Sequence, residues 1–275
     1  MSIQYKRGIT QHKSLNCYKV IGSLCSKIYV YHYMSLEAFF NSFDIEDMHV
    51  RFSQPSTWND MFEKRFYNAD YVTKLHAVPS THPSLFAFCN TACQNSEPGW
   101  RMYAKGVNNT IQLKINHKEW RKVINRFAFD NGYSAYEGTA FYGIKEAHLA
   151  RLHQTTYTRG SKSYPVAGHN TLFSNFDLES YLNLLLMKRD AFEYEHEIRY
   201  FIIPNQEPVK NHCLIPINWK NVVKEIRYHP NIGMEDFNKL KNIVDNIWGN
   251  HGILMPYDVE KGKYADFTQP IIVEK

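Results

Sequence analysis

The segment over 187–203, MKRDAFEYEHEIRYFII, carries the side chains best suited to chemistry in this chain. Its second half alternates between charged and apolar residues, which predicts a β-strand, because successive strand side chains point to opposite faces. Two carboxylates about 7 Å apart on one strand face repel each other unless a cation or a substrate lies between them. We therefore expect the charged face to meet solvent, a partner or a cleft. The predicted charged face carries Glu195, Glu197 and Arg199, and the opposite face carries His196, Ile198, Tyr200 and Ile202.

The composition is that of a globular protein with a mildly basic charge balance. The chain has 275 residues, which allows one large domain or two small ones, and 44% of them are hydrophobic, which is enough for a real core. The 19 tyrosines and 17 phenylalanines are expected mostly in that core. The net charge is +5, and the lysines and arginines are scattered. This balance permits an anionic ligand or nucleic acid without requiring one.

The cysteines and the N-terminus indicate a reduced, soluble, cytoplasmic protein. No CxxC pair occurs among the five cysteines, so a zinc site is not expected. The N-terminal residues are polar and lack the apolar core of a signal peptide. No uncharged apolar run reaches the length that spans a membrane, so no membrane association is expected.

The remaining patterns predict one mixed α+β domain over 27–275 after a polar lead-in over 1–26. Ser35 is expected to cap a short helix, and Thr57 with Asp60 has the spacing of a capping box. The region over 130–172 is rich in Gly, Ser, Thr and Tyr and is expected to hold strands and a loop. Alternating segments predict strands over 27–33, 48–53, 85–89, 108–115, 213–217 and 222–229. Helical spacing predicts helices over 36–43, 100–104, 116–127, 178–187 and 234–248.

Four short motifs follow one another along the chain and together resemble a known family. They are Tyr31-His32-Tyr33-Met34-Ser35; Asn59-Asp60-Met61-Phe62-Glu63; Trp100, Tyr103, Ala104 and Gly106; and Lys188, Phe192, Glu195, Glu197 and Arg199. In this order the set is similar to the bacterial family called domain of unknown function 2971, over roughly residues 29–230. The family name implies no activity.

A second resemblance suggests a reaction. The ADP-ribosyltransferase fold has a His or Arg on its first strand, a Ser/Thr element on a later strand and a catalytic Glu at the start of a late strand. This chain resembles that pattern: His32 corresponds to the first-strand residue, Ser53 with Ser56-Thr57 to the Ser/Thr element, and Glu195-His196-Glu197 to the segment with the catalytic Glu. It departs from the pattern in having no compact Ser-Thr-Ser triplet. The resemblance implies an ADP-ribosyltransferase-like fold, with a central, mostly antiparallel sheet, in one piece or split, flanked by helices.

The resemblance also implies roles for these residues, with NAD as the substrate and no metal. Cleavage of the nicotinamide–ribose bond passes through an oxocarbenium-like transition state, which a carboxylate stabilises. Glu197 would take that role, while Glu195 would orient or deprotonate the acceptor. His32 would hold the adenosine-side ribose, Tyr33 or Trp100 would face nicotinamide, and Arg199 or Lys188 would neutralise the diphosphate. Further candidates for binding NAD are Ser53, Asn59, Asp60, Glu63 and Tyr103.

Three functions stay open on the sequence. The first is an NAD-dependent ADP-ribosyltransferase or NAD glycohydrolase, of the kind found among toxins and phage-defence effectors, with a protein or nucleic-acid acceptor and an antitoxin or immunity partner. The second is a Mg²⁺-dependent nuclease, in which Asp60, Glu63, Glu195 and Glu197 hold the metal and Lys188 lies near the scissile phosphate. The third is a non-catalytic module that binds nucleic acid or protein. Each candidate residue also has a structural interpretation, in which His32 and Trp100 pack in the core and the charged residues pair with one another.

Overall fold

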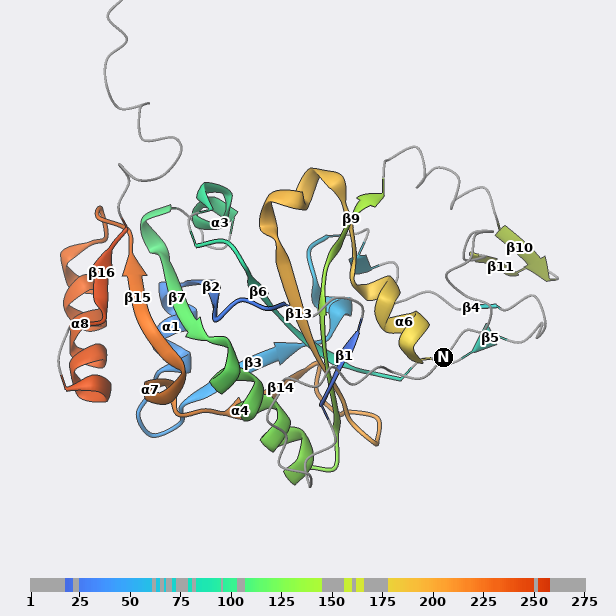
Figure 1. The fold of residues 1–275 in the computed structure, drawn as a ribbon, viewed down its shortest axis with the longest axis horizontal. Coiled ribbons are helices and arrows are strands. Elements are labelled where there is room, and N and C mark those ends of the chain that lie inside the picture. Colours follow the sequence, from blue (N-terminus) through green and yellow to red (C-terminus); the bar gives the residue numbers. More distant parts are fainter. Residues whose placement is uncertain are drawn as a thin grey trace, which may run out of the picture. The chain divides into compact units, whose positions relative to one another are not determined.

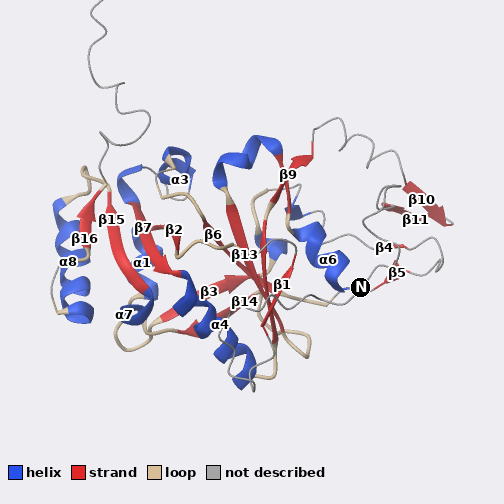
Figure 2. Cartoon of the chain, in the orientation of Figure 1, coloured by secondary structure: helices blue, strands red, loops and turns tan. Residues whose placement is uncertain are grey.

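The computed structural model describes a little over two thirds of the chain, in several segments. Helices and strands are both found along these segments (Figure 2). No helix within them is long and apolar enough to cross a membrane. The described residues are 18–21, 25–60, 63–64, 67, 71–72, 79–80, 83–94, 96–102, 107–144, 156–159, 162–165, 178–249 and 252–257.

The chain forms two compact units, and each combines segments that are far apart in sequence. Unit 1 contains Met1–Ser26, Arg51–Cys89 and Arg121–Ile215, and unit 2 contains Lys27–Val50, Asn90–Trp120 and Pro216–Lys275. The sequence-based boundaries, a lead-in over 1–26 and one domain over 27–275, stay a prediction.

Unit 1 is built on strands in the order β1-β8-β13-β6 (Figure 1). These strands are β1 (Tyr18–Ile21), β8 (Ser134–Thr139), β13 (Glu197–Ile203) and β6 (Phe86–Thr91), of which β6 has its last two residues in unit 2. β13 runs antiparallel to β8, with Arg199 opposite Gly138 and Phe201 opposite Tyr136. β1 runs parallel to β8, although the sequence predicted no strand in this part of the lead-in.

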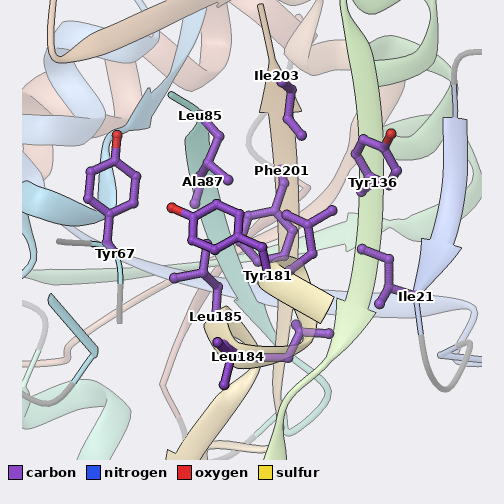
Figure 3. Close-up of a cluster of buried hydrophobic side chains, with 12 residues drawn as sticks. Ile21, Tyr67, Leu85, Ala87, Tyr136, Tyr181, Leu184, Leu185, Phe201 and Ile203 are labelled. Carbon is purple, nitrogen blue, oxygen red and sulfur yellow. The ribbon is translucent and has the colours of Figure 1, made fainter. Parts of the chain in front are cut away.

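Helix α6 (Leu178–Leu185) supplies the core of unit 1. Its apolar side chains pack with Phe201 of β13 and Tyr136 of β8 (Figure 3). A Cβ on Gly138 would lie 2.3 Å from Leu186 Cδ1, so any larger residue would require the Leu186 side chain to move. Because Arg199 and Phe201 share a face of β13 with alternate side chains, the α6 side of the sheet also receives the charged residues of this strand.

Unit 2 is built on strands β2 (Tyr29–Ser35), β7 (Thr110–Asn116), β15 (Val223–Tyr228) and β16 (Leu254–Pro256). β7 is antiparallel to both β2 and β15, and β16 is parallel to β15. Helix α1 (Leu36–Ser42) follows β2, and the Ser35 hydroxyl accepts a hydrogen bond from the Ala38 N–H, so the predicted cap is confirmed. Helix α8 (Met234–Trp248) has the predicted bounds and buries Leu240 and Val244.

The other elements are short, apart from α4. The α-helices are α3 (Glu97–Met102), α4 (His117–Asp130) and α7 (Trp219–Val222), and the 3-10 helices are η1 (Pro55–Thr57), η2 (Val107–Asn109) and η3 (Asp190–Glu195). The strands are β3 (His49–Ser53), β4 (Tyr71–Val72), β5 (Pro79–Ser80), β9 (Phe141–Ile144), β10 (Thr156–Arg159), β11 (Lys162–Pro165), β12 (Met187–Arg189) and β14 (His212–Pro216).

The strand pairings confirm a mixed α+β fold with a mostly antiparallel sheet. Among the strand pairs with a described register, β1 with β8, β12 with β9 and β15 with β16 are parallel, and the others are antiparallel. Strands β8 to β11 fall within 130–172, where the sequence predicted strands without bounds.

Two local predictions were wrong. Strand β13 begins at Glu197, whereas Glu195 ends η3 and His196 takes a left-handed conformation with φ 40°. The alternation therefore does not extend back to Glu195, because the chain turns at His196 before it enters the sheet. The capping box at Thr57 and Asp60 does not form either. The Thr57 hydroxyl donates to the Gln54 carbonyl, and the Lys64 N–H bonds to the Asp60 carbonyl at the start of the next helical turn.

Candidate functional site

Five charged side chains of unit 1 form what we call the buried ion cluster: Glu63, Lys188, Glu195, Glu197 and Arg199. The Lys188 ammonium donates hydrogen bonds to the carboxylates of Glu195 and Glu197, and it lies 3.4 Å from Glu63 Oε1. None of the five residues is more than 8% exposed. The sequence predicted a charged face that meets solvent, a partner or a cleft, but these charges are buried and pair with one another.

Arg199 holds one side of the buried ion cluster. Its guanidinium donates from Nε to Glu197 Oε1 at 2.7 Å and from Nη2 to Glu63 Oε1 at 2.7 Å. Its Nη1 donates to the carbonyl of Leu185, the last residue of α6, where an unpaired helix carbonyl accepts a cation favourably. The guanidinium also lies 4.6 Å from the centre of the Trp58 ring. The contacts with Glu63, Leu185 and Trp58 hold the Arg199 guanidinium in place, and the guanidinium in turn orients the Glu197 carboxylate.

The local backbone explains how Glu195 and Glu197 reach the same lysine. η3 closes with a hydrogen bond from the His196 N–H to the Glu193 carbonyl, and His196 then reverses the chain direction. On the other side, the Glu197 N–H donates to the Tyr142 hydroxyl at 2.6 Å, and the Glu197 carbonyl accepts from the Ala140 N–H at 2.9 Å. A left-handed non-glycine residue costs free energy and is found preferentially at functional sites.

The charges within the cluster set two different carboxylate pKa values. Three carboxylates face two cations, so the cluster is neutral only when one carboxylate is protonated. Burial raises the pKa of Glu195 to about 7, with Glu197 adding to the shift and Lys188 opposing it. Burial also disfavours the charge of Glu197, but Arg199 and Lys188 outweigh it and hold the Glu197 pKa below its usual range. Glu197 is therefore an ionised carboxylate, and Glu195 exchanges its proton near neutral pH.

Aromatic side chains surround the lysine end of the cluster. The ring of Phe192 in η3 lies 5.5 Å from Lys188 Nζ and 4.7 Å from the Arg189 guanidinium. Arg189 also pairs with Asp60 at 2.9 Å. Tyr194 is 36% exposed. These residues lie between the buried ion cluster and the exposed side chain of Tyr194 in η3.

Tyr33 and Trp100, which the sequence assigned to nicotinamide, lie in unit 2. They pack edge to face, with ring centres 5.6 Å apart, and both are buried. Trp100 also packs against Tyr257, at 4.5 Å, and the Tyr33 hydroxyl accepts hydrogen bonds from Gln112 Nε2 and the Ser96 N–H. Their ring faces are therefore occupied by protein, as the core interpretation of these residues expected.

The other predicted site residues are dispersed. His32 lies in β2 opposite Leu113, whereas Tyr33 lies opposite Gln112, so the two side chains point to opposite faces of β2. Ser53 pairs with Ala87 in unit 1, and Asn59 is exposed. Tyr103 lies outside the described residues. The structure thus brings together Glu63, Lys188, Glu195, Glu197 and Arg199, with Asp60 beside them, and the roles assigned to all these residues stay predictions.

Sequence reasoning missed Tyr142 and Cys89, which also adjoin Glu197. Tyr142 bonds to the Glu197 backbone, and the pKa of the Cys89 thiol is raised by burial and by Glu197. Tyr142 comes from the region over 130–172, whose composition gave no periodic signal. Cys89 was considered only as a zinc ligand. Both residues reach Glu197 through the folding of distant segments against β13, which the sequence does not show.

The nuclease hypothesis requires carboxylates that are available to a divalent cation. Within the segments that the structure describes, no three His, Cys, Asp or Glu side chains are arranged to hold a metal ion. The carboxylates named for that role point to Lys188, Arg199 and Arg189 instead.

Comparisons with known proteins give a distant structural similarity. No family model matches the chain, so membership of the domain of unknown function 2971 family is not confirmed, and no curated protein matches it. Among solved structures, the chain is similar to DarT of Thermus sp. 2.9 in complex with ADP-ribosylated single-stranded DNA. The TM-score is 0.36 at 8% identity, over 86% of this chain and 96% of that chain. A similarity this distant assigns no function.

Proposed function

We propose that this protein cleaves the nicotinamide–ribose bond of NAD and transfers ADP-ribose to a protein or nucleic-acid acceptor, with the buried ion cluster as its active site. The observation that carries the proposal is the pairing of two carboxylates with opposite pKa shifts on one lysine. Carboxylates whose environments separate their pKa values in this way are suited to different steps of one reaction. A toxin or defence effector with an antitoxin or immunity partner would be consistent with this activity.

Glu197 is suited to stabilise the cationic transition state. When the C1′–N bond breaks, neutral nicotinamide leaves with the bonding electron pair and positive charge develops on the ribose. A carboxylate that is ionised, oriented by Arg199 and shielded from water attracts that charge without having to reorganise. It can also accept a hydrogen bond from a ribose hydroxyl. Its fixed charge therefore acts more strongly on the transition state than on NAD.

Glu195 is suited to act as the base that serves the acceptor. The new bond joins an oxygen or nitrogen of the acceptor to C1′, and the proton of that atom passes to the Glu195 carboxylate. A base with a pKa of about 7 is half ionised at neutral pH, which is near the optimum for proton transfer. With water as the acceptor, the same steps give NAD glycohydrolase activity.

The test is nicotinamide release from NAD by the purified protein, with and without EDTA. Glu197→Gln keeps the size of the side chain and removes the charge, and it is expected to reduce release at least 100-fold. Glu137→Gln is the matched control, because Glu137 is also a buried carboxylate of unit 1 that pairs with an arginine, at 2.5 Å from Arg121. Glu137→Gln should lower stability but leave release per folded molecule within about twofold.

The outcomes separate the candidate functions. Release that persists in EDTA and is lost in Glu197→Gln alone supports the proposal. Equal losses in both variants would mean that any broken ion pair disables the protein, and the assignment of Glu197 would be wrong. A folded wild-type protein that neither binds NAD nor releases nicotinamide with protein or nucleic acid added would refute the proposed function.

A further inference from the structure

Tyr142 occupies a fixed position beside the two carboxylates. It lies in β9, whose parallel pairing with β12 places Tyr142 directly opposite Lys188. The strand is anchored on both sides, since the Phe141 N–H bonds to the Leu186 carbonyl at 2.8 Å and the Ala140 N–H bonds to the Glu197 carbonyl. The Tyr142 side chain therefore has little freedom to leave the site.

The hydroxyl of Tyr142 has a proton to donate. A phenol has one O–H donor and two acceptor positions. Here the oxygen accepts the Glu197 N–H at 2.6 Å, which orients the hydroxyl without using its proton. Within the described part of the chain, no acceptor for that proton is found. Burial, with a smaller effect of Glu197, raises the Tyr142 pKa above its usual value, so the hydroxyl stays protonated at neutral pH.

We propose that Tyr142 is a substrate-binding residue that donates a hydrogen bond to the ribose hydroxyl whose own proton is accepted by Glu197. This inference rests on the proposed function. A hydroxyl group can donate to one partner while it accepts from another, so the 2′-hydroxyl of the nicotinamide ribose can bridge Glu197 and Tyr142.

The surroundings favour a ligand over a purely structural role. Tyr142 is only partly buried, and its neighbour Phe141 is 42% exposed, so this end of β9 adjoins the surface. The charges of Glu197, Lys188 and Glu195 all act on the hydroxyl, which places it within the cluster's electrostatic reach. A hydroxyl that accepts the Glu197 N–H keeps its own proton for a second partner, which a bound ribose hydroxyl would supply.

The test compares Tyr142→Phe with wild type on two substrates, NAD and the analogue that lacks the 2′-hydroxyl on the nicotinamide ribose. Removing one hydrogen bond to a bound hydroxyl is expected to raise KM for NAD about tenfold with kcat within twofold. The effect on KM should fall below twofold for the deoxy analogue, because the bridging oxygen is then absent. Tyr18→Phe is the matched control, since it removes a buried tyrosine hydroxyl of unit 1 that donates to Glu137 at 2.5 Å. It should change KM for neither substrate.

The results distinguish this inference from the proposed function. If Tyr142→Phe leaves KM for NAD unchanged, or raises it equally for both substrates, Tyr142 does not bind the ribose hydroxyl, while the NAD reaction itself stands. If the wild type neither binds nor cleaves NAD, the proposed function fails and this inference fails with it. A loss of thermal stability in both tyrosine variants, with the KM change confined to Tyr142→Phe and NAD, supports the assignment.

Discussion

Replacing Arg199 by methionine would test whether the buried ion cluster behaves as its geometry suggests. Methionine fills most of the arginine volume but removes the guanidinium that holds Glu197 and Glu63. The cluster would then contain three carboxylates and only Lys188 to neutralise them. Arg199→Met therefore leaves uncompensated negative charge in a region that is almost closed to water.

The expected loss follows from the burial and the distances. Arg199 is 1% exposed, and both of its carboxylate contacts are 2.7 Å long. At an effective dielectric constant of about 20, each contact represents roughly 6 kcal/mol of gross attraction, most of which is offset by desolvation. Removing one partner of such a buried pair costs about 3–5 kcal/mol of unfolding free energy. That is a large part of the roughly 5–15 kcal/mol that stabilises a typical domain.

The assay is urea unfolding at pH 8, where the carboxylates are most strongly ionised. Arg126→Met is the matched control, because Arg126 also makes a 2.7 Å contact, with Asp130, but its side chain is 67% exposed. An exposed pair of this kind contributes about 0.3–0.5 kcal/mol. Adding Glu63→Gln to Arg199→Met should restore about 1–2 kcal/mol, because it removes one of the unpaired charges.

Three results would contradict this reasoning. An Arg199→Met loss as small as that of Arg126→Met would show that burial does not strengthen these contacts. An additional loss on adding Glu63→Gln would show that Glu63 is stabilised by something other than Arg199. A loss that is larger at pH 5 than at pH 8 would also refute it, because protonation of the carboxylates should relieve the repulsion.

Two further predictions concern the turn between the carboxylates. The Glu195 pKa of about 7 lies above its ordinary value of 4.5, so the folded state binds more protons between these pH values, and unfolding free energy should fall as pH rises through this window. The full shift corresponds to roughly 3 kcal/mol, so we expect a loss of about 2–3 kcal/mol. Urea midpoints at pH 5 and pH 8 should differ in wild type and much less in Glu195→Gln. His196 has φ 40° and an exposed side chain. His196→Gly should change the free energy of unfolding by less than about 1 kcal/mol, because relief of backbone strain opposes the greater entropy of glycine in the unfolded chain. His196→Val should lower the free energy of unfolding by about 1–2 kcal/mol, because a β-branched residue is more strained at positive φ. Thermal melts of the two variants check this, and equal stability of the valine and glycine variants would rule out strain at this position.

Local patterns in the sequence predicted the elements whose cause is local. Helix α8 has apolar residues at helical spacing and ends at Gly249, which takes the left-handed conformation with φ 79° that glycine adopts easily. Ser35 and the helix after it form the expected cap. The strands β3, β7 and β15 were found within a few residues, because alternation reports directly on a sheet with two different faces.

The sequence was misleading where tertiary contacts outweigh alternation. The residues EHEIR read as one strand, but β13 starts only at Glu197, since Tyr142 and Ala140 hold its backbone there and His196 turns the preceding chain away. The prediction that Glu195 and Glu197 lie close together was nevertheless right, although they do not share a strand face. Lys188 draws both carboxylates to one ammonium.

The sequence by itself determined that Lys188, Glu195, Glu197 and Arg199 lie close along the chain with opposite charges, and therefore that a charged site forms in this region. Only the tertiary structure decided that the site is buried, that Glu63 and Tyr142 belong to it, and that Glu195 and Glu197 have opposite pKa shifts. The physical reason is that burial and charge balance depend on residues brought together by strand pairing and helix packing. The spacing of residues within one segment carries no information about those partners.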